Sequence, residues 1–203
     1  ADATVSNNGT WVFGYGSLIW RPAFPHVERR AASLRGWARR FWQGSHDHRG
    51  TPEAPGRVVT LVPAPGATCL GVAYLVDHEV FEHLDHREKN GYQRFSAQVH
   101  LLDRACAVPG VVYVADEDNH AFLGPAPLNE LAEHISASHG PSGSNRDYVL
   151  HLAEALHALG EDPRRLVDIA LDEHAATGVA WAERVAAMAD RPEAVARHDS
   201  VFD

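Results

Sequence analysis

Two glycines and a serine directly follow a short apolar segment near the start of the chain. Residues 11–13 are Trp-Val-Phe, residue types that favour a buried strand, and Gly14, Tyr15, Gly16 and Ser17 come next. Glycine lets the backbone turn sharply and lets another group approach the main chain closely. The N–H groups of such a turn can hold a small anion. The segment therefore predicts a strand that ends in a backbone anion site, with the Ser17 hydroxyl as a positioning group.

Two catalytic motifs resemble this segment but do not fit it. Dinucleotide binding needs Gly-x-Gly-x-x-Gly, and the third glycine position here is Ile19. The hydrolase elbow needs Gly-x-Ser-x-Gly, but Ser17 follows Gly16 directly. A tight turn that merely ends a core strand stays open as the alternative to an anion site.

Glu88 is the second candidate for chemistry. It lies between Arg87 and Lys89, where we expect a helix to pass into a strand. Most glutamates in such places are solvated surface groups. A carboxyl in a partly apolar site instead has a raised pKa and can serve as a general acid or base. We expect Tyr92 and Phe95 to help provide that setting, and Arg87 to oppose it if it points inward.

The 14 histidines raise the alternative of a metal site. His46 and His48 flank Asp47, and His83 and His86 are three residues apart on an expected helix. That spacing permits metal binding, and Asp47 or Asp85 could supply the acidic ligand that a hydrolytic metal site needs beside two histidines. We treat these histidines as solvated or structural and expect no metal and no cofactor.

Composition limits the class of protein. The 203 residues suit one domain, and the net charge of −9 argues against a nucleic-acid partner. No apolar run is long enough to span a membrane, and residues 1–10 lack a signal-peptide core. Cys69 and Cys106 are too few for a disulfide framework, so we expect a protein of the reducing cytoplasm. Composition leaves the choice between a monomer and a homodimer open.

Periodicity predicts strands in the first half of the chain. Gly44 to Gly56 is expected to be a loop, and Pro63, Pro65 and Gly66 a turn between two hairpin-like strands. The expected extended segments are 11–13, 32–43, 58–62, 69–75, 93–102 and 111–115.

Helices are expected between these strands and after them. Asp77 has the features of an N-cap for a helix ending near Arg87, and Asn145 could cap a helix ended by Gly160. Further helices are expected from Leu128 to Gly140-Pro141, from Asp162-Pro163 onward, and at 179–188. Strands followed by helices predict an α+β domain over 11–190, with a disordered or tag-like segment at 1–10 and a polar tail at 191–203.

Several segments together resemble the ChaC-type γ-glutamylcyclotransferases, which act on glutathione. The likeness covers roughly residues 11 to 160 in the family's order. It rests on FGYGSLIWRP (13–22), RFWQGSHDHRG (40–50), PGRVVTL (55–61), REKNGY (87–92), LGPAP (123–127) and SGSNRDY (142–148).

The resemblance implies a fold, an activity and site residues. The expected fold is a small mixed β-barrel flanked by helices, and the expected reaction converts glutathione to 5-oxoproline and cysteinylglycine. By resemblance Glu88 is the acid/base, the turn Tyr15-Gly16-Ser17-Leu18 binds the γ-glutamyl group, and Tyr148 is a further site residue. Tyr148 could equally be a packing residue at a helix start.

The glycyl carboxylate of glutathione would need an arginine, and Arg57 and Arg40 are the candidates. Other γ-glutamyl amines or peptides as substrates stay open, as does a non-catalytic γ-glutamyl-binding module.

Overall fold

The computed structural model describes residues 9–88 and 91–160. Strands fill the first part of this stretch and helices the last, as the sequence predicts. In chain order the elements are β1 (Gly9–Gly14), the 3-10 helix η1 (Ser17–Ile19), β2 (Glu28–Ser45), β3 (Gly56–Asp77), α1 (His78–Glu88), β4 (Gln93–Leu101), β5 (Cys106–Val114), α2 (Leu128–Ala137), β6 (His139–Gly140), β7 (Gly143–Ser144) and α3 (Asn145–Ala158).

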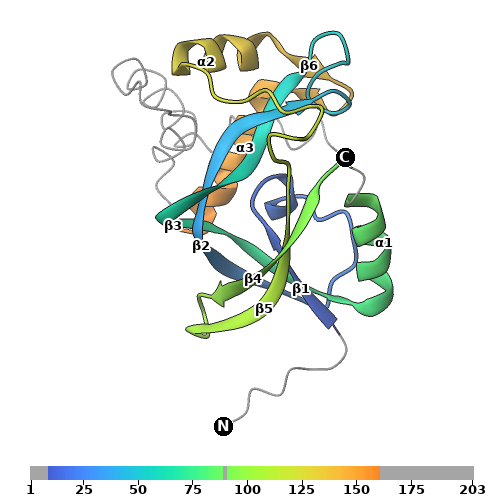
Figure 1. The fold of residues 1–203 in the computed structure, drawn as a ribbon, viewed down its shortest axis with the longest axis vertical. Helices are drawn as coiled ribbons and strands as arrows, with labels where there is room; N and C mark the ends of the chain where they lie inside the picture. The colour runs from blue at the N-terminus through green and yellow to red at the C-terminus, as the bar shows by residue number, and fades with distance from the viewer. Residues whose placement is uncertain (1–8, 89–90, 161–203) are drawn as a thin grey trace.

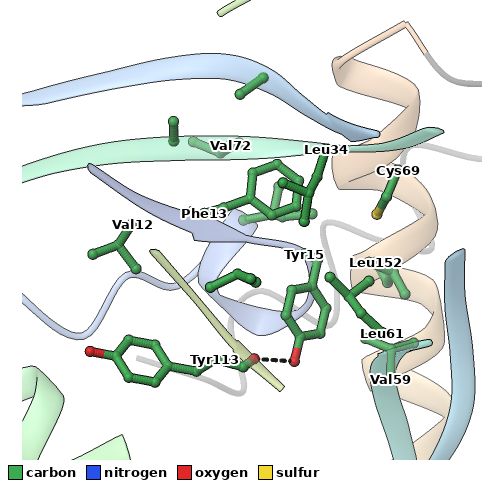
Figure 2. Close-up of a cluster of buried hydrophobic side chains, with 14 of the residues drawn as sticks. Val12, Phe13, Tyr15, Leu34, Val59, Leu61, Cys69, Val72, Tyr113 and Leu152 are labelled. Atoms are coloured by element: carbon green, nitrogen blue, oxygen red, sulfur yellow. Dashed lines mark hydrogen bonds between the residues drawn. The ribbon is translucent and has the colours of Figure 1, made fainter. Parts of the chain in front are cut away.

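Five strands close into a barrel in the order β1-β3-β2-β4-β5 (Figure 1). Neighbouring strands run antiparallel except β1 and β5, which are parallel and complete the closure. Closure leaves no open sheet edge in the barrel and turns alternate side chains inward. Val12, Phe13, Leu34 and Val72 are almost completely buried in the hydrophobic core that forms on and within this barrel (Figure 2). The predicted α+β class and small mixed barrel are confirmed.

β3 is one continuous strand, so the predicted turn at Pro63, Pro65 and Gly66 is wrong. Trp37 of β2 pairs with residue 63 of β3, and Arg35 pairs with residue 68. The four residues 64–67 of β3 therefore lie opposite the single residue Gly36 of β2. The prolines and glycine thus form a wide bulge that bends both strands without reversing them. Gly36, at φ +85°, takes the matching bend in β2.

β2 and β3 extend beyond the barrel as a two-stranded ribbon (Figure 1). In the figure α2 lies at the far end of this ribbon and α3 runs behind the ribbon. α1 lies at the right of the barrel. α3 also packs against η1. The glycine turn between β1 and η1 therefore lies between the barrel and α3.

One predicted helix cap is confirmed and one is wrong. The Asp77 carboxylate accepts a hydrogen bond from the Val80 N–H (2.9 Å), as predicted for the N-cap of α1. α3 is capped instead by Ser144, whose hydroxyl accepts from the Asp147 N–H (3.1 Å). The Asn145 side chain is buried and pairs with both the N–H and the carbonyl of Arg57 (2.7 Å each). Asn145 thus joins α3 to β3.

Some predictions fall outside the described residues. These are the N-terminal segment up to residue 8, the helices expected from 162 onward and at 179–188, and the tail at 191–203. β1 begins at Gly9, two residues before the predicted strand. Over the residues that are described, we find no helix with the length and apolar character needed to cross a bilayer.

Candidate active site

The glycine turn leaves the barrel at the end of β1 and folds at once into η1. The Ile19 N–H donates to the Gly16 carbonyl (3.0 Å), and the Arg21 N–H donates to the Ser17 carbonyl (2.7 Å). No side chain among the described residues caps the N-terminus of η1. The Ser17 side chain is exposed. The first N–H groups of a helical turn have no partner within it, so they point outward and can hold an anion.

Two buried contacts fix Tyr15 at the start of this turn. Its hydroxyl donates to the Tyr113 carbonyl of β5 (2.7 Å), as Figure 2 shows, and Arg39 Nε donates to the Tyr15 carbonyl (2.8 Å). The Tyr15 side chain is thereby committed to the barrel interior. Its burial raises the pKa of the phenol well above the ordinary value, so the group stays neutral. Tyr15 can therefore contribute to a bound ligand through its backbone.

The Tyr148 hydroxyl of α3 lies next to Gly16. A Cβ atom added at Gly16 would lie 3.0 Å from the Tyr148 hydroxyl and 3.0 Å from Val59 Cγ2. The hydroxyl accepts a hydrogen bond from the Val59 N–H (3.3 Å), and burial raises its pKa to about 12. A neutral phenol that accepts one hydrogen bond still has its own proton to donate. The absence of a side chain at position 16 is what lets this donor reach the turn.

Arg49 supports the ring of Tyr148 from the loop after β2. Its guanidinium carbon lies 5.7 Å from the centre of that ring, and Nη1 donates to the Ser144 carbonyl (3.1 Å). Trp20 contacts the ring edge-on, with centroids 5.4 Å apart. Cation–π and aromatic contacts of this kind limit the motion of a buried ring. Tyr148 is therefore held on several sides at the start of α3.

Glu88 is the last residue of α1, and its side chain is 27% exposed. Burial raises the pKa of the carboxyl, and the positive charge of Arg87, with Nε 3.8 Å from Oε1, partly opposes that rise. The negative charge of Glu88 in turn raises the pKa of Tyr15, Tyr92 and Tyr113. α1 itself packs against β1, the strand that leads into the glycine turn.

Tyr92 lies beside the end of α1, where its N–H donates to the Glu88 carbonyl (3.1 Å). Tyr92 is partly buried, and burial raises its pKa above the ordinary value. Phe95, expected beside Glu88, packs against Trp37 with ring centroids 5.5 Å apart. Tyr148 thus lies at the glycine turn, and Tyr92 lies at the end of α1 that carries Glu88.

The two arginine candidates have different surroundings. Arg57 is buried, and its Nη1 donates to the carbonyls of Phe41 (2.9 Å) and Gly124 (2.7 Å). Burial lowers the pKa of its guanidinium. Arg40 is partly buried, and its Nη1 donates to the Arg39 carbonyl (2.8 Å). Arg57 thus has a structural role in the ribbon, because it binds two backbone carbonyls there.

The histidines do not assemble into a metal centre within residues 9–88 and 91–160. No group of three His, Cys, Asp or Glu side chains with metal-binding geometry occurs there. The His46 ring stacks on His120, with centroids 6.2 Å apart, and His48 Nδ1 pairs with the Ser142 hydroxyl (3.0 Å). Both cysteines are free thiols.

Two residues near the site, Tyr113 and Arg49, were not singled out in the sequence, and Asp85 was considered only as a possible metal ligand with His83 and His86. Asp85 alone carried a local signal, because it lies three residues before Glu88 and so on the same helix face. The contacts of Tyr113 and Arg49 depend on the strand register and on the position of α3.

The closed barrel with its flanking helices matches the fold of a solved γ-glutamylcyclotransferase. The chain aligns with the crystal structure of a γ-glutamylcyclotransferase specific to glutathione from yeast. The TM-score is 0.67 at 32% identity, over 91% of this chain and 96% of that one.

The sequence comparisons identify the family. The family described as ChaC-like protein matches residues 10–177. γ-Glutamylcyclotransferase 2-3 of Arabidopsis thaliana is 46% identical over 79% of this chain and 86% of its own length. Glutathione-specific γ-glutamylcyclotransferase 1 of Homo sapiens is 39% identical over 82% and 75% respectively. The chain therefore belongs to the ChaC-like family.

Proposed function

We propose that this protein is a lyase-type γ-glutamylcyclotransferase that converts glutathione to 5-oxoproline and cysteinylglycine. The observation that carries the proposal is the partly buried carboxyl of Glu88, with its raised pKa, at the end of a helix that packs against β1, the strand leading into the glycine turn. The yeast and human relatives are named glutathione-specific, which supports the choice of substrate.

The substrate contains its own nucleophile. The α-amine of the γ-glutamyl group attacks the γ-carbonyl carbon, a five-membered lactam forms, and the bond to the cysteinyl nitrogen breaks. Because attacker and target are tethered, no encounter with water or with an enzyme nucleophile is needed, a saving of several kcal/mol in the barrier. The enzyme has to bind the folded-back substrate and carry protons from the α-nitrogen to the departing nitrogen.

Glu88 is the group we assign to that proton. The α-amine is an ammonium at neutral pH and cannot attack until it loses a proton, which the ionised Glu88 carboxylate can accept. The cysteinyl nitrogen takes this proton as its bond to the γ-carbon breaks, which regenerates the carboxylate. The attacking nitrogen loses a second proton as the lactam forms, and the released amine takes it up to become an ammonium. A raised pKa suits this role because the group must both accept and return a proton near neutral pH.

The turn and Tyr148 are assigned to binding and charge stabilisation. The backbone N–H groups of Tyr15, Gly16, Ser17 and Leu18, with the Ser17 hydroxyl, hold the γ-glutamyl group. The Tyr148 proton is directed to a substrate oxygen at the turn. Donors fixed before the reaction stabilise the developing oxyanion without reorganising.

Arg57 and Arg40 are our candidates for the glycyl carboxylate. Arg57 already donates to two backbone carbonyls, so its replacement is expected to affect folding as well as binding. We also propose the cytoplasm as the compartment, in keeping with the two free thiols and a thiol peptide as substrate.

The direct test is incubation with glutathione followed by mass spectrometry for 5-oxoproline, with a panel of other γ-glutamyl amines beside it. Equal turnover of the whole panel would contradict a preference for glutathione. Calorimetric binding of glutathione without product would instead identify a binding module.

A further inference from the structure

Tyr113 joins the two halves of the candidate site. Its carbonyl accepts from the Tyr15 hydroxyl (2.7 Å), and its own hydroxyl donates to Asp85 Oδ1 (2.8 Å). Figure 2 shows the ring of Tyr113 pointing away from Tyr15, so the two contacts leave in opposite directions. One residue of β5 thus contacts both the residue that begins the glycine turn and the last turn of α1.

Asp85 completes this connection through a second strand. Its Oδ2 forms an ion pair with Arg94 Nη1 of β4 (2.8 Å), and the Asp85 side chain is 15% exposed. The Arg94 guanidinium also lies over the Phe81 ring of α1, 5.9 Å from its centre. We call Tyr113, Asp85 and Arg94 the clamp. Both oxygens of one carboxylate are engaged by charge-assisted or phenolic donors on neighbouring strands, an arrangement that fixes the orientation of the carboxylate.

The clamp acts where α1 most needs support. Glu88 is the last residue of the helix, and helix ends fray unless they are held. Asp85 precedes Glu88 by three residues and therefore lies on the same face of α1. The His78–Glu82 pair on the same helix (3.1 Å) is exposed and lies within α1, so it gives no such attachment to the barrel.

We propose that Tyr113 and Asp85 are positioning residues, which hold the end of α1 so that the Glu88 carboxyl keeps a fixed position relative to the glycine turn. The inference depends on the role proposed for Glu88. Neither residue exchanges a proton with the substrate. Misplacement of a catalytic group by about 1 Å can lower the rate by up to about 100-fold, so loss of the clamp should act on kcat.

Three variants divide the clamp. Tyr113→Phe removes one oxygen and keeps the ring and the carbonyl that holds Tyr15. Asp85→Ala removes both the hydrogen bond from Tyr113 and the ion pair with Arg94. Asp85→Asn keeps an acceptor for Tyr113 but loses the ion pair. Glu82→Gln is the matched control, because it removes an exposed ion pair from the same helix. Thermal unfolding of each variant sets an assay temperature at which it is folded.

We expect kcat for glutathione to fall about 10- to 100-fold in Asp85→Ala. Tyr113→Phe should lose less, and Asp85→Asn should recover part of the loss. KM should stay near the wild-type value because the turn is intact, and Glu82→Gln should match wild type in both constants. A general collapse of the site would raise KM as kcat falls, and that result would overturn the proposal.

Glu88→Gln in the same assay separates the two proposals. If it turns over glutathione normally, the role of Glu88 is refuted. If it is inactive while Tyr113→Phe and Asp85→Ala keep wild-type kcat, only the clamp is refuted. Should Asp85→Ala fail to fold, Tyr113→Phe decides, since it deletes a single atom.

Discussion

Replacing Gly16 by alanine should press a methyl group against the Tyr148 hydroxyl. The new methyl carbon would lie 3.0 Å from the Tyr148 hydroxyl and 3.0 Å from Val59 Cγ2, closer than such contacts normally allow. The neighbours must move by a few tenths of an ångström, which lengthens the hydrogen bond from Val59 N–H to Tyr148, already 3.3 Å. Overpacking of this kind costs about 1–3 kcal/mol, and loss of the hydrogen bond about 1 kcal/mol.

A double-mutant cycle measures this contact. In a Tyr148→Phe background the oxygen is absent, so Gly16→Ala should cost about 1 kcal/mol less in the free energy of unfolding than it does in wild type. The part of the destabilisation that comes from the contact with Val59 Cγ2 should remain. Urea unfolding gives the four free energies, and 5-oxoproline formation gives the matching values of kcat/KM, which we expect to fall at least about 10-fold in Gly16→Ala.

Gly66→Ala is the control for the cost of adding a methyl group. Gly66 lies at φ +84°, and nothing comes within 4 Å of an added Cβ, so alanine there is strained without touching the site. It should lose about 1–2 kcal/mol of stability and keep its kcat. Equal costs of Gly16→Ala in the two Tyr148 backgrounds would refute the reasoning, because the hydroxyl would then not be what the methyl meets.

Three further predictions concern Glu88, the arginines and Asn145. The raised pKa of Glu88 means that the folded protein favours the neutral carboxyl. That contribution is complete below the unfolded pKa and is lost as pH rises through the folded pKa. Glu88→Gln should therefore be slightly more stable than wild type at neutral pH and equal to it in acid, and wild-type kcat/KM should fall as pH drops through the raised pKa; a pH series of thermal melts and rates checks both. Arg57→Ala should lose about 1–3 kcal/mol in urea unfolding because it leaves two backbone carbonyls unpaired, and Arg40→Ala should mainly raise KM; unchanged KM in both would dismiss them as carboxylate ligands. Asn145→Ala should lose a similar amount of stability by breaking two bonds to the Arg57 backbone, and a wild-type melting curve would contradict this.

Local chemistry explains which elements could be predicted. Asp77 caps α1 through a hydrogen bond to a residue three positions away, and such short-range geometry is visible in sequence. The apolar alternation of 93–101 likewise predicted β4 and its buried face. The turn expected at 63–66 failed because proline and glycine also occur in bulges, and only pairing with β2 distinguishes the two.

Longer-range contacts explain what could not be predicted. Asn145 has the residue type of a cap, but Ser144 caps the helix because the Asn145 side chain is satisfied by Arg57, far away in the chain. Glu88 and the glycine turn were connected only by resemblance to a family, because the packing of α1 against β1 is a contact between segments far apart in the sequence. Tyr113 needs two facts that a single sequence does not contain, its register beside β1 and the side of the barrel that α1 covers.

The central claim is that the substrate cyclises on itself while Glu88 transfers a proton. Turnover of glutathione in heavy-oxygen water, followed by mass spectrometry, tests both parts at once. The account predicts 5-oxoproline without heavy oxygen from the wild-type protein and no product from Glu88→Gln. Glutamate carrying heavy oxygen would show attack by water, and normal 5-oxoproline formation by Glu88→Gln would show that the proton goes elsewhere; either result contradicts the account.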